Sequence, residues 1–163
     1  NGSSPHLAAE MMKSQADLFA VHVPYRGAAP ALQDLLAGQI DFYFDPGIGL
    51  NQVRAGKLKL LAVGSLKRSP MFPDAPTLDE AGIAGYEANT WQMMVGPARM
   101  PEPVVTRLSR ALGDFVATPE AKKYFIGQGM EPTVSTPSEA GQYIAKEAAR
   151  WTAIIRGIGI SID

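Results

Sequence analysis

The sequence predicts an α/β fold in which helices pack on a parallel sheet. The first observation is that short apolar segments alternate with segments of helical periodicity up to residue 65, a pattern typical of βαβ units. The second is that residues 58–65 form an apolar run without polar alternation, as in a strand buried on both faces of a parallel sheet.

The elements of this first part follow from local signals. Ser3 or Ser4 is the expected N-cap of a helix that runs to about residue 17, because Pro5 then lies in the first turn, where no N–H is needed. Gly38 and Gly56 each follow a helical segment and are suited to end it. Further helices are expected at 29–37 and 48–55, and strands at 19–24, 40–45 and 58–65.

The pattern changes after residue 65. A proline-rich loop is followed by a short predicted helix at 77–81 and by an extended segment at 87–97 that is centred on Trp91. The remainder is helical, and Thr118 and Thr136 give two of its helices polar starts. Helices with apolar residues at helical spacing are expected at 101–117, 119–127 and 138–157.

The expected domain boundary lies near Tyr86. Residues 1–86 contain the alternating strands and helices and form one lobe, which lacks its first strand. Residues 87–163 contain a crossover strand and helices that need a sheet outside the chain. We therefore expect these helices to belong to a second, incomplete lobe.

Composition excludes several kinds of chemistry. The chain has 163 residues and a net charge of −1, which gives no reason to expect a nucleic acid or an anionic membrane as partner. It has no cysteine and only two histidines, so neither disulfides nor a metal site is expected. Its apolar runs are too short to span a bilayer. No nucleotide-binding motif or nucleophile elbow is present, so we predict no cofactor and no catalytic residue.

Two helix starts made of small residues suggest a site for a carboxylate. No large side chain follows Arg26 in the turn before residue 29, and Gly27 has a permissive backbone. The segment from Asn1 to His6 is a comparable turn. Such starts expose backbone N–H groups at the positive end of a helix dipole, where anions bind. The ligand-binding residues expected in these turns are Ser3, Ser4, Gly27, Ala28 and Ala29.

Three further side chains are candidates for the same site. His6 could donate to a ligand carboxylate or pack against the helix cap. Asp45 ends an apolar strand at the edge where α/β sheets bind ligands, so it could orient the ligand or cap the turn that follows. Tyr25 is expected to form a wall of the cleft, whereas His22 is expected to be structural.

A series of short motifs gives the sequence a specific resemblance. In chain order they are Asn1-Gly2-Ser3-Ser4-Pro5-His6-Leu7, Val23-Pro24-Tyr25-Arg26-Gly27, Leu36-Ala37-Gly38-Gln39-Ile40-Asp41, Phe44-Asp45, Ala55-Gly56-Lys57-Leu58, Lys67-Arg68-Ser69-Pro70, Pro73-Asp74-Ala75-Pro76-Thr77, Glu80-Ala81-Gly82, Trp91, Gly96-Pro97 and Trp151. In this order and spacing, they resemble the C-terminal part of the substrate-binding receptors of tripartite tricarboxylate transporters, the Bug/TctC family.

This resemblance implies a type II periplasmic-binding-protein fold, in which two α/β lobes close over a ligand. It implies a periplasmic protein with a signal peptide upstream of this chain, which captures a mono-, di- or tricarboxylate and passes it to membrane permease subunits. It implies no nucleic-acid partner and no direct insertion into the membrane. It also favours the ligand-binding interpretation of His6 and Asp45, because the matching positions of the family lie at the cleft.

Two other functions stay open on the residues. The effector-binding domain of a LysR-type transcription regulator shares the fold, and a helix-turn-helix upstream would indicate it. A small α/β enzyme acting on organic acids is the second alternative, and turnover of a bound acid would indicate that function.

Overall fold

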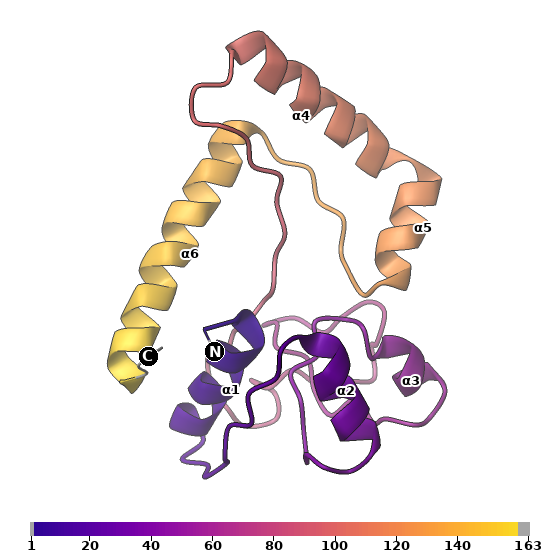
Figure 1. Cartoon of the computed structure of the whole chain (residues 1–163), viewed down its shortest axis with the longest axis vertical. Coiled ribbons are helices and arrows are strands. Elements are labelled where there is room, and N and C mark those ends of the chain that lie inside the picture. The colour runs from indigo at the N-terminus through magenta and orange to yellow at the C-terminus, as the bar shows by residue number, and fades with distance from the viewer. Residues whose placement is uncertain (1, 160–163) are drawn as a thin grey trace. The chain divides into compact units, whose positions relative to one another are not determined.

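The computed structural model describes residues 2–159 (Figure 1). Its helices are α1 (Ser4–Gln15), α2 (Ala28–Leu36), α3 (Leu50–Arg54), α4 (Glu102–Ala117), α5 (Pro119–Gly127) and α6 (Pro137–Ile158). The chain divides into two compact units. Unit 1 comprises residues up to Thr90 together with the segment from Ile154 onward, and unit 2 comprises Trp91–Ala153.

The first two helices of unit 1 form within two residues of the predicted bounds. Ser3 is the N-cap of α1, with φ −79° and ψ 161°, and α1 buries Ala8 and Met11 on one face. Gly27 precedes α2, and Gly38, with φ 69°, follows it. The third helix forms but is shorter than the predicted segment 48–55.

The predicted strands do not form in the described part of the chain. Among residues 2–159, strand-type pairing is limited to an isolated parallel bridge between Val63 and Thr77. The strand predictions are therefore wrong for these residues, whereas the lobe to which the segments were assigned stays a prediction. Apolar residues in the segments predicted as strands are exposed instead of buried, and the exposed fraction is 90% for Phe19 and 74% for Val21. A strand depends on ladder hydrogen bonds to its neighbours, and an apolar pattern alone cannot supply them.

The helix predicted at 77–81 is also wrong. This segment forms turns, in which the Thr77 N–H donates to Glu80 Oε2 over 2.9 Å and the Glu80 N–H donates to Thr77 Oγ1 over 3.0 Å. This reciprocal pair has the form of a capping box. Gly82, with φ 109°, follows immediately and ends the turn.

The core of unit 1 is centred on Tyr86, which is fully buried. Its ring lies 6.3 Å from the ring of Phe44, measured between centroids, with an interplanar angle of 24°. Nearby, the Ala88 N–H donates to the Gly64 carbonyl over 2.8 Å. A Cβ atom at position 64 would lie 2.6 Å from the Ala88 carbonyl oxygen, so this approach requires glycine.

In unit 2, polar caps mark the starts of α5 and α6, as predicted. The Ala121 N–H donates to Thr118 Oγ1 over 3.2 Å at the start of α5. At the start of α6, the Glu139 N–H donates to Thr136 Oγ1 over 3.2 Å, and the Thr136 N–H donates to Glu139 Oε2 over 2.8 Å. These hydrogen bonds satisfy donors that a helix start leaves unpaired.

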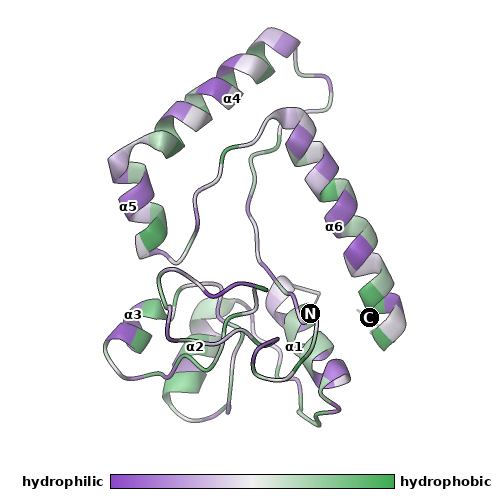
Figure 2. Ribbon diagram, turned by 180° about the vertical axis from the view of Figure 1, so that it is seen from behind, coloured by the Kyte–Doolittle hydropathy of each residue, from purple (hydrophilic) through white to green (hydrophobic). Residues whose placement is uncertain are grey.

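Hydrophobic and hydrophilic residues alternate along the helices of unit 2 (Figure 2). On α4 the apolar positions form a stripe at helical spacing, whose side chains are between 39% and 54% exposed. The residues of this α4 stripe are Val104, Leu108, Leu112 and Phe115. Within unit 2, Trp91 makes an edge-on contact with Tyr143, with centroids 5.6 Å apart and planes at 83°. None of the helices in residues 2–159 combines the length and apolar character needed to cross a bilayer.

Candidate functional site

The first turn of α1 is held by its own backbone and by His6. Leu7 N–H donates to the Ser3 carbonyl over 3.0 Å, and Gly2 N–H donates to Nδ1 of His6 over 3.1 Å. Ser3 and Ser4 are exposed, and the Ser3 side chain makes no cap hydrogen bond. His6 therefore packs against the helix cap, as one of its two interpretations expected, while the hydroxyl of Ser3 makes no contribution to the cap.

His6 also stacks on His22, with ring centroids 4.1 Å apart and planes inclined by 24°. Burial lowers the pKa of His6 from its ordinary value, and the neighbouring His22 lowers it further, although Glu10 acts in the opposite direction. Because Nδ1 accepts a hydrogen bond from Gly2, the proton of the neutral ring belongs on Nε2, which lies 3.9 Å from Glu10 Oε1. The stack places the first turn of α1 beside the segment that leads to Tyr25.

The start of α2 has the exposed backbone that the sequence predicts. Gly27 is its N-cap residue, with φ 131° and ψ 173°, and offers no side chain to cap the helix. Ala28 is half-buried and Ala29 is exposed. The first N–H groups of a helix lack intrahelical acceptors, so the turn offers donors for an anion. That this turn and the start of α1 face one ligand stays a prediction.

Asp45 stabilises the turn that follows it. Its Oδ2 accepts hydrogen bonds from the N–H groups of Gly47 over 3.1 Å and Gly49 over 2.9 Å. This contact corresponds to the capping interpretation of Asp45. An additional role in orienting a ligand stays a prediction.

Tyr25 makes a contact that the sequence did not predict. Its hydroxyl donates to Oδ2 of Asp34 over 2.7 Å, and this hydrogen bond raises the pKa of Tyr25. Asp34 lies in α2 within the segment Ala-Leu-Gln-Asp-Leu-Leu. A carboxylate in a helical segment of mostly apolar residues is the signal that could have drawn attention to it.

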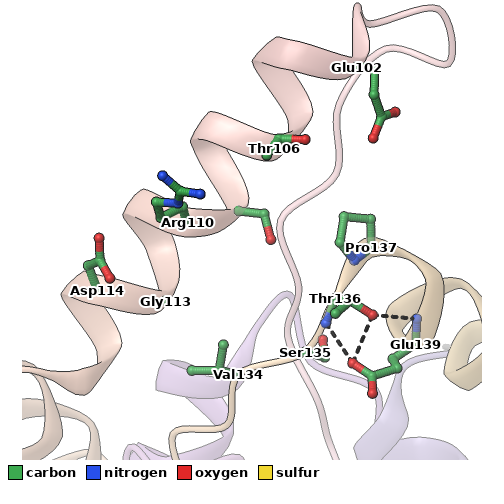
Figure 3. Close-up of a pocket in the computed structure, with 11 residues that line it drawn as sticks. Glu102, Thr106, Arg110, Gly113, Asp114, Val134, Ser135, Thr136, Pro137 and Glu139 are labelled. Atoms are coloured by element: carbon green, nitrogen blue, oxygen red, sulfur yellow. Dashed lines mark hydrogen bonds between the residues drawn. The ribbon is translucent and has the colours of Figure 1, made fainter.

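A separate groove lies within unit 2, between α4 and residues 134–139, with a volume of about 590 Å³ (Figure 3). Side chains of both charge signs line it, including Glu102, Arg110, Asp114 and Glu139. It is a less suitable carboxylate site than the helix starts of unit 1, because three of these four groups are acidic. Glu139 is also bonded to Thr136.

The described groups in unit 1 are suited to binding. Backbone N–H groups and small hydroxyls can hold a carboxylate without reacting with it. Within residues 2–159, no three His, Asp or Glu side chains gather in a way that could hold a metal ion. The candidate site consists of the two helix starts, the stacked pair His6 and His22, and Tyr25 with its hydrogen bond to Asp34.

Comparison with known proteins decides the family. Residues 1–160 match the family described as the tripartite tricarboxylate transporter family receptor, TctC. The chain belongs to the TctC receptor family. Among its relatives, BugT of Bordetella pertussis is 30% identical over 99% of this chain and 50% of its own length. A UPF0065 protein from the tcbD-tcbE intergenic region of Pseudomonas sp. strain P51 is 33% identical over 94% of this chain and 46% of its own length.

Solved structures agree with membership of the TctC family. Rpa4515 of R. palustris with adipate superposes with a TM-score of 0.92 at 31% identity, over 98% of this chain and 54% of its own. The periplasmic binding protein BugD superposes with a TM-score of 0.89 at 32% identity, over 98% of this chain and 55% of its own. MatC of Rhodopseudomonas palustris with bound malate superposes with a TM-score of 0.81 at 27% identity, over 94% of this chain and 54% of its own.

The present TctC chain thus spans about half the length of the relatives it matches. The likeness supports the α/β periplasmic-binding fold class that the sequence predicted. The sheet itself does not form in residues 2–159.

Proposed function

We propose that this chain is part of an extracytoplasmic solute-binding receptor that captures a small organic acid for a tripartite tricarboxylate-type transporter. The observation that carries the proposal is the likeness, over 98% of the chain, to the structure of Rpa4515 with adipate. MatC, with bound malate, adds a second case. Adipate and malate are both dicarboxylates, so the ligand class is a small acid with at least one carboxylate.

In the proposed site, the carboxylate lies between the two helix starts of unit 1. The N–H groups of Ala28 and Ala29 donate to one carboxylate, and Gly27 allows the ligand to come close to the backbone. Ser3, Ser4 and His6 contribute from α1, Tyr25 forms a wall and Asp45 sets the ligand's orientation. Ser3, Ser4 and Ala29 are exposed, which supports their access to a ligand.

The proposed receptor has two lobes. Residues 1–86 belong to the second lobe, and residues 87–163 provide a crossover segment and helices that pack on the first lobe. The half-exposed α4 stripe supports this division, because an apolar surface at regular spacing is typical of an interface. Closure of the two lobes completes the site.

The proposed activity is reversible capture without chemical change. The receptor is periplasmic, and the loaded form passes its ligand to the permease subunits of the transporter. The family match supports a receptor over both a LysR-type effector domain and an acid-converting enzyme, because it covers residues 1–160.

The test is calorimetry on the intact protein that carries this sequence. Adipate, malate and a tricarboxylate are titrated, with adipamide as a neutral control of similar shape. We expect at least one acid to bind, adipamide not to bind, and the bound acid to be recovered unchanged. Equal binding of acid and amide, or no binding of any carboxylate, would refute the proposal, and a new product would indicate an enzyme.

A further inference from the structure

We propose that Asp34 is a positioning residue for ligand binding, because its hydrogen bond from Tyr25 holds the turn that presents the N–H groups of Ala28 and Ala29. This inference rests on the proposed function, since it concerns the same carboxylate site. It adds a residue that does not itself contact the ligand.

The hydrogen bond spans the turn. Tyr25 lies before the N-cap residue Gly27 of α2, which covers Ala28–Leu36, and Asp34 lies near the C-terminal end of that helix. The donor and acceptor are 2.7 Å apart. Both residues are half-buried, which shields the bond partly from water, and an ionised acceptor strengthens it further.

The turn needs such a tether because its own sequence does little to fix it. Gly27 is at φ 131° and has no side chain that could cap α2, and the first turn of the helix contains no acidic residue. Glycine reaches more backbone conformations than other residues do. A bond from Tyr25 to the body of the helix therefore restricts the residues between them.

The same bond limits what Tyr25 can offer a ligand. Its single hydroxyl proton is already donated to Asp34, so the ring contributes shape while the backbone donors of α2 contribute the polar contacts. Without the tether, the turn has to be ordered when the ligand binds. This ordering reduces the affinity.

The inference is tested by calorimetry of the intact protein with adipate and malate. Asp34→Ala and Tyr25→Phe should each raise the Kd about three- to tenfold, the effect of one or two newly mobile residues. The Kd of the double variant should be no higher than that of the single variant that binds more weakly, because both substitutions remove the same hydrogen bond. Asp34→Asn keeps an acceptor oxygen and should retain most of the affinity. Asp74→Ala, which removes an exposed carboxylate from the same unit, is the matched control.

A second measurement separates positioning from general damage to the fold. In the ligand-free protein, the NMR order parameters of the backbone N–H groups of Gly27, Ala28 and Ala29 should be lower in Asp34→Ala, with no change in α1. If the parent binds an acid and Asp34→Ala binds it equally tightly, or if the two single effects add, the positioning role is wrong while the proposed function stands. If the parent binds no carboxylate, both proposals fail together.

Discussion

The hydroxyl of Tyr86 donates a hydrogen bond to the backbone carbonyl of Ala8 over 2.9 Å. The two residues are 78 positions apart in the sequence, and the bond is buried. It joins α1 to the non-helical segment that contains Tyr86, so it fixes the helix whose first turn contains Ser3, Ser4 and His6.

Replacing Tyr86 by Phe should therefore lower the free energy of unfolding. The change keeps the ring and removes this hydrogen bond, but the Ala8 carbonyl stays within the hydrogen-bond ladder of α1, so the expected cost is about 0.5–1.5 kcal/mol. Urea denaturation of the intact protein measures the loss. Tyr124→Phe is the control, because Tyr124 is 62% exposed and its hydroxyl should matter by less than about 0.5 kcal/mol. Equal effects at the two positions would contradict the prediction.

Alanine at position 64 should be destabilising, whereas alanine at position 141 should not. The added Cβ at position 64 would lie 2.6 Å from the Ala88 carbonyl oxygen, and at position 141 it would meet no atom within 4 Å. We expect Gly64→Ala to cost about 1–3 kcal/mol. Gly141→Ala, inside α6, should gain about 0.5–1 kcal/mol. Thermal unfolding of both variants is the measurement, and a gain at both positions would show that the backbone near Ala88 yields freely.

Acidification should reduce stability through His6. Its folded-state pKa is below the ordinary value of 6.5, chiefly because of burial and then because of His22. Between the folded and unfolded pKa values, the unfolded chain therefore binds more protons than the folded protein does. The contribution of His6 to the free energy of unfolding is complete above pH 6.5 and is lost as the pH falls through the folded pKa. NMR titration of the ring protons should place the His6 midpoint below 6.5. In His6→Gln the corresponding pH dependence should be absent, and an unchanged profile in that variant would assign the effect to another group.

Ala28→Leu should weaken ligand binding with little effect on stability. The larger side chain would obstruct the backbone donors at the start of α2, and the loss of one charge-assisted hydrogen bond raises the Kd about tenfold to hundredfold. Calorimetry on the intact protein tests this. Ala145→Leu adds the same bulk at an exposed position of α6 and should leave the Kd unchanged. A Kd for Ala28→Leu equal to that of the parent would place the carboxylate elsewhere.

The helices were predictable because their signals are local. Pro5 behind Ser3, and Thr118 and Thr136 before their helices, act within one turn of the chain, and the structure has helices beginning at these places. The strands were not predictable because their signal is incomplete. The apolar residues near Phe19 and Leu61 indicate a preference for burial, but the pairing that makes a strand depends on other segments.

The site shows the same limit. The small-residue start of α2 could be read directly from Gly27 and its neighbours. The role of Asp45 could not, because a carboxylate at that position can cap a turn or meet a ligand, and only the structure shows its bonds to Gly47 and Gly49. The hydrogen bond between Tyr25 and Asp34 depends on how the turn before α2 lies against that helix, and the spacing of residues in the sequence does not predict this arrangement.

The close approach of Ala88 to Gly64 has a mechanical consequence. The backbone hydrogen bond between them holds the chain two residues before Thr90, where the first segment of unit 1 ends. On this crossing, the backbone of unit 1 is therefore anchored as far along the chain as Ala88. The anchor depends on the absence of a side chain at position 64, because a Cβ atom there would lie 2.6 Å from the Ala88 carbonyl oxygen.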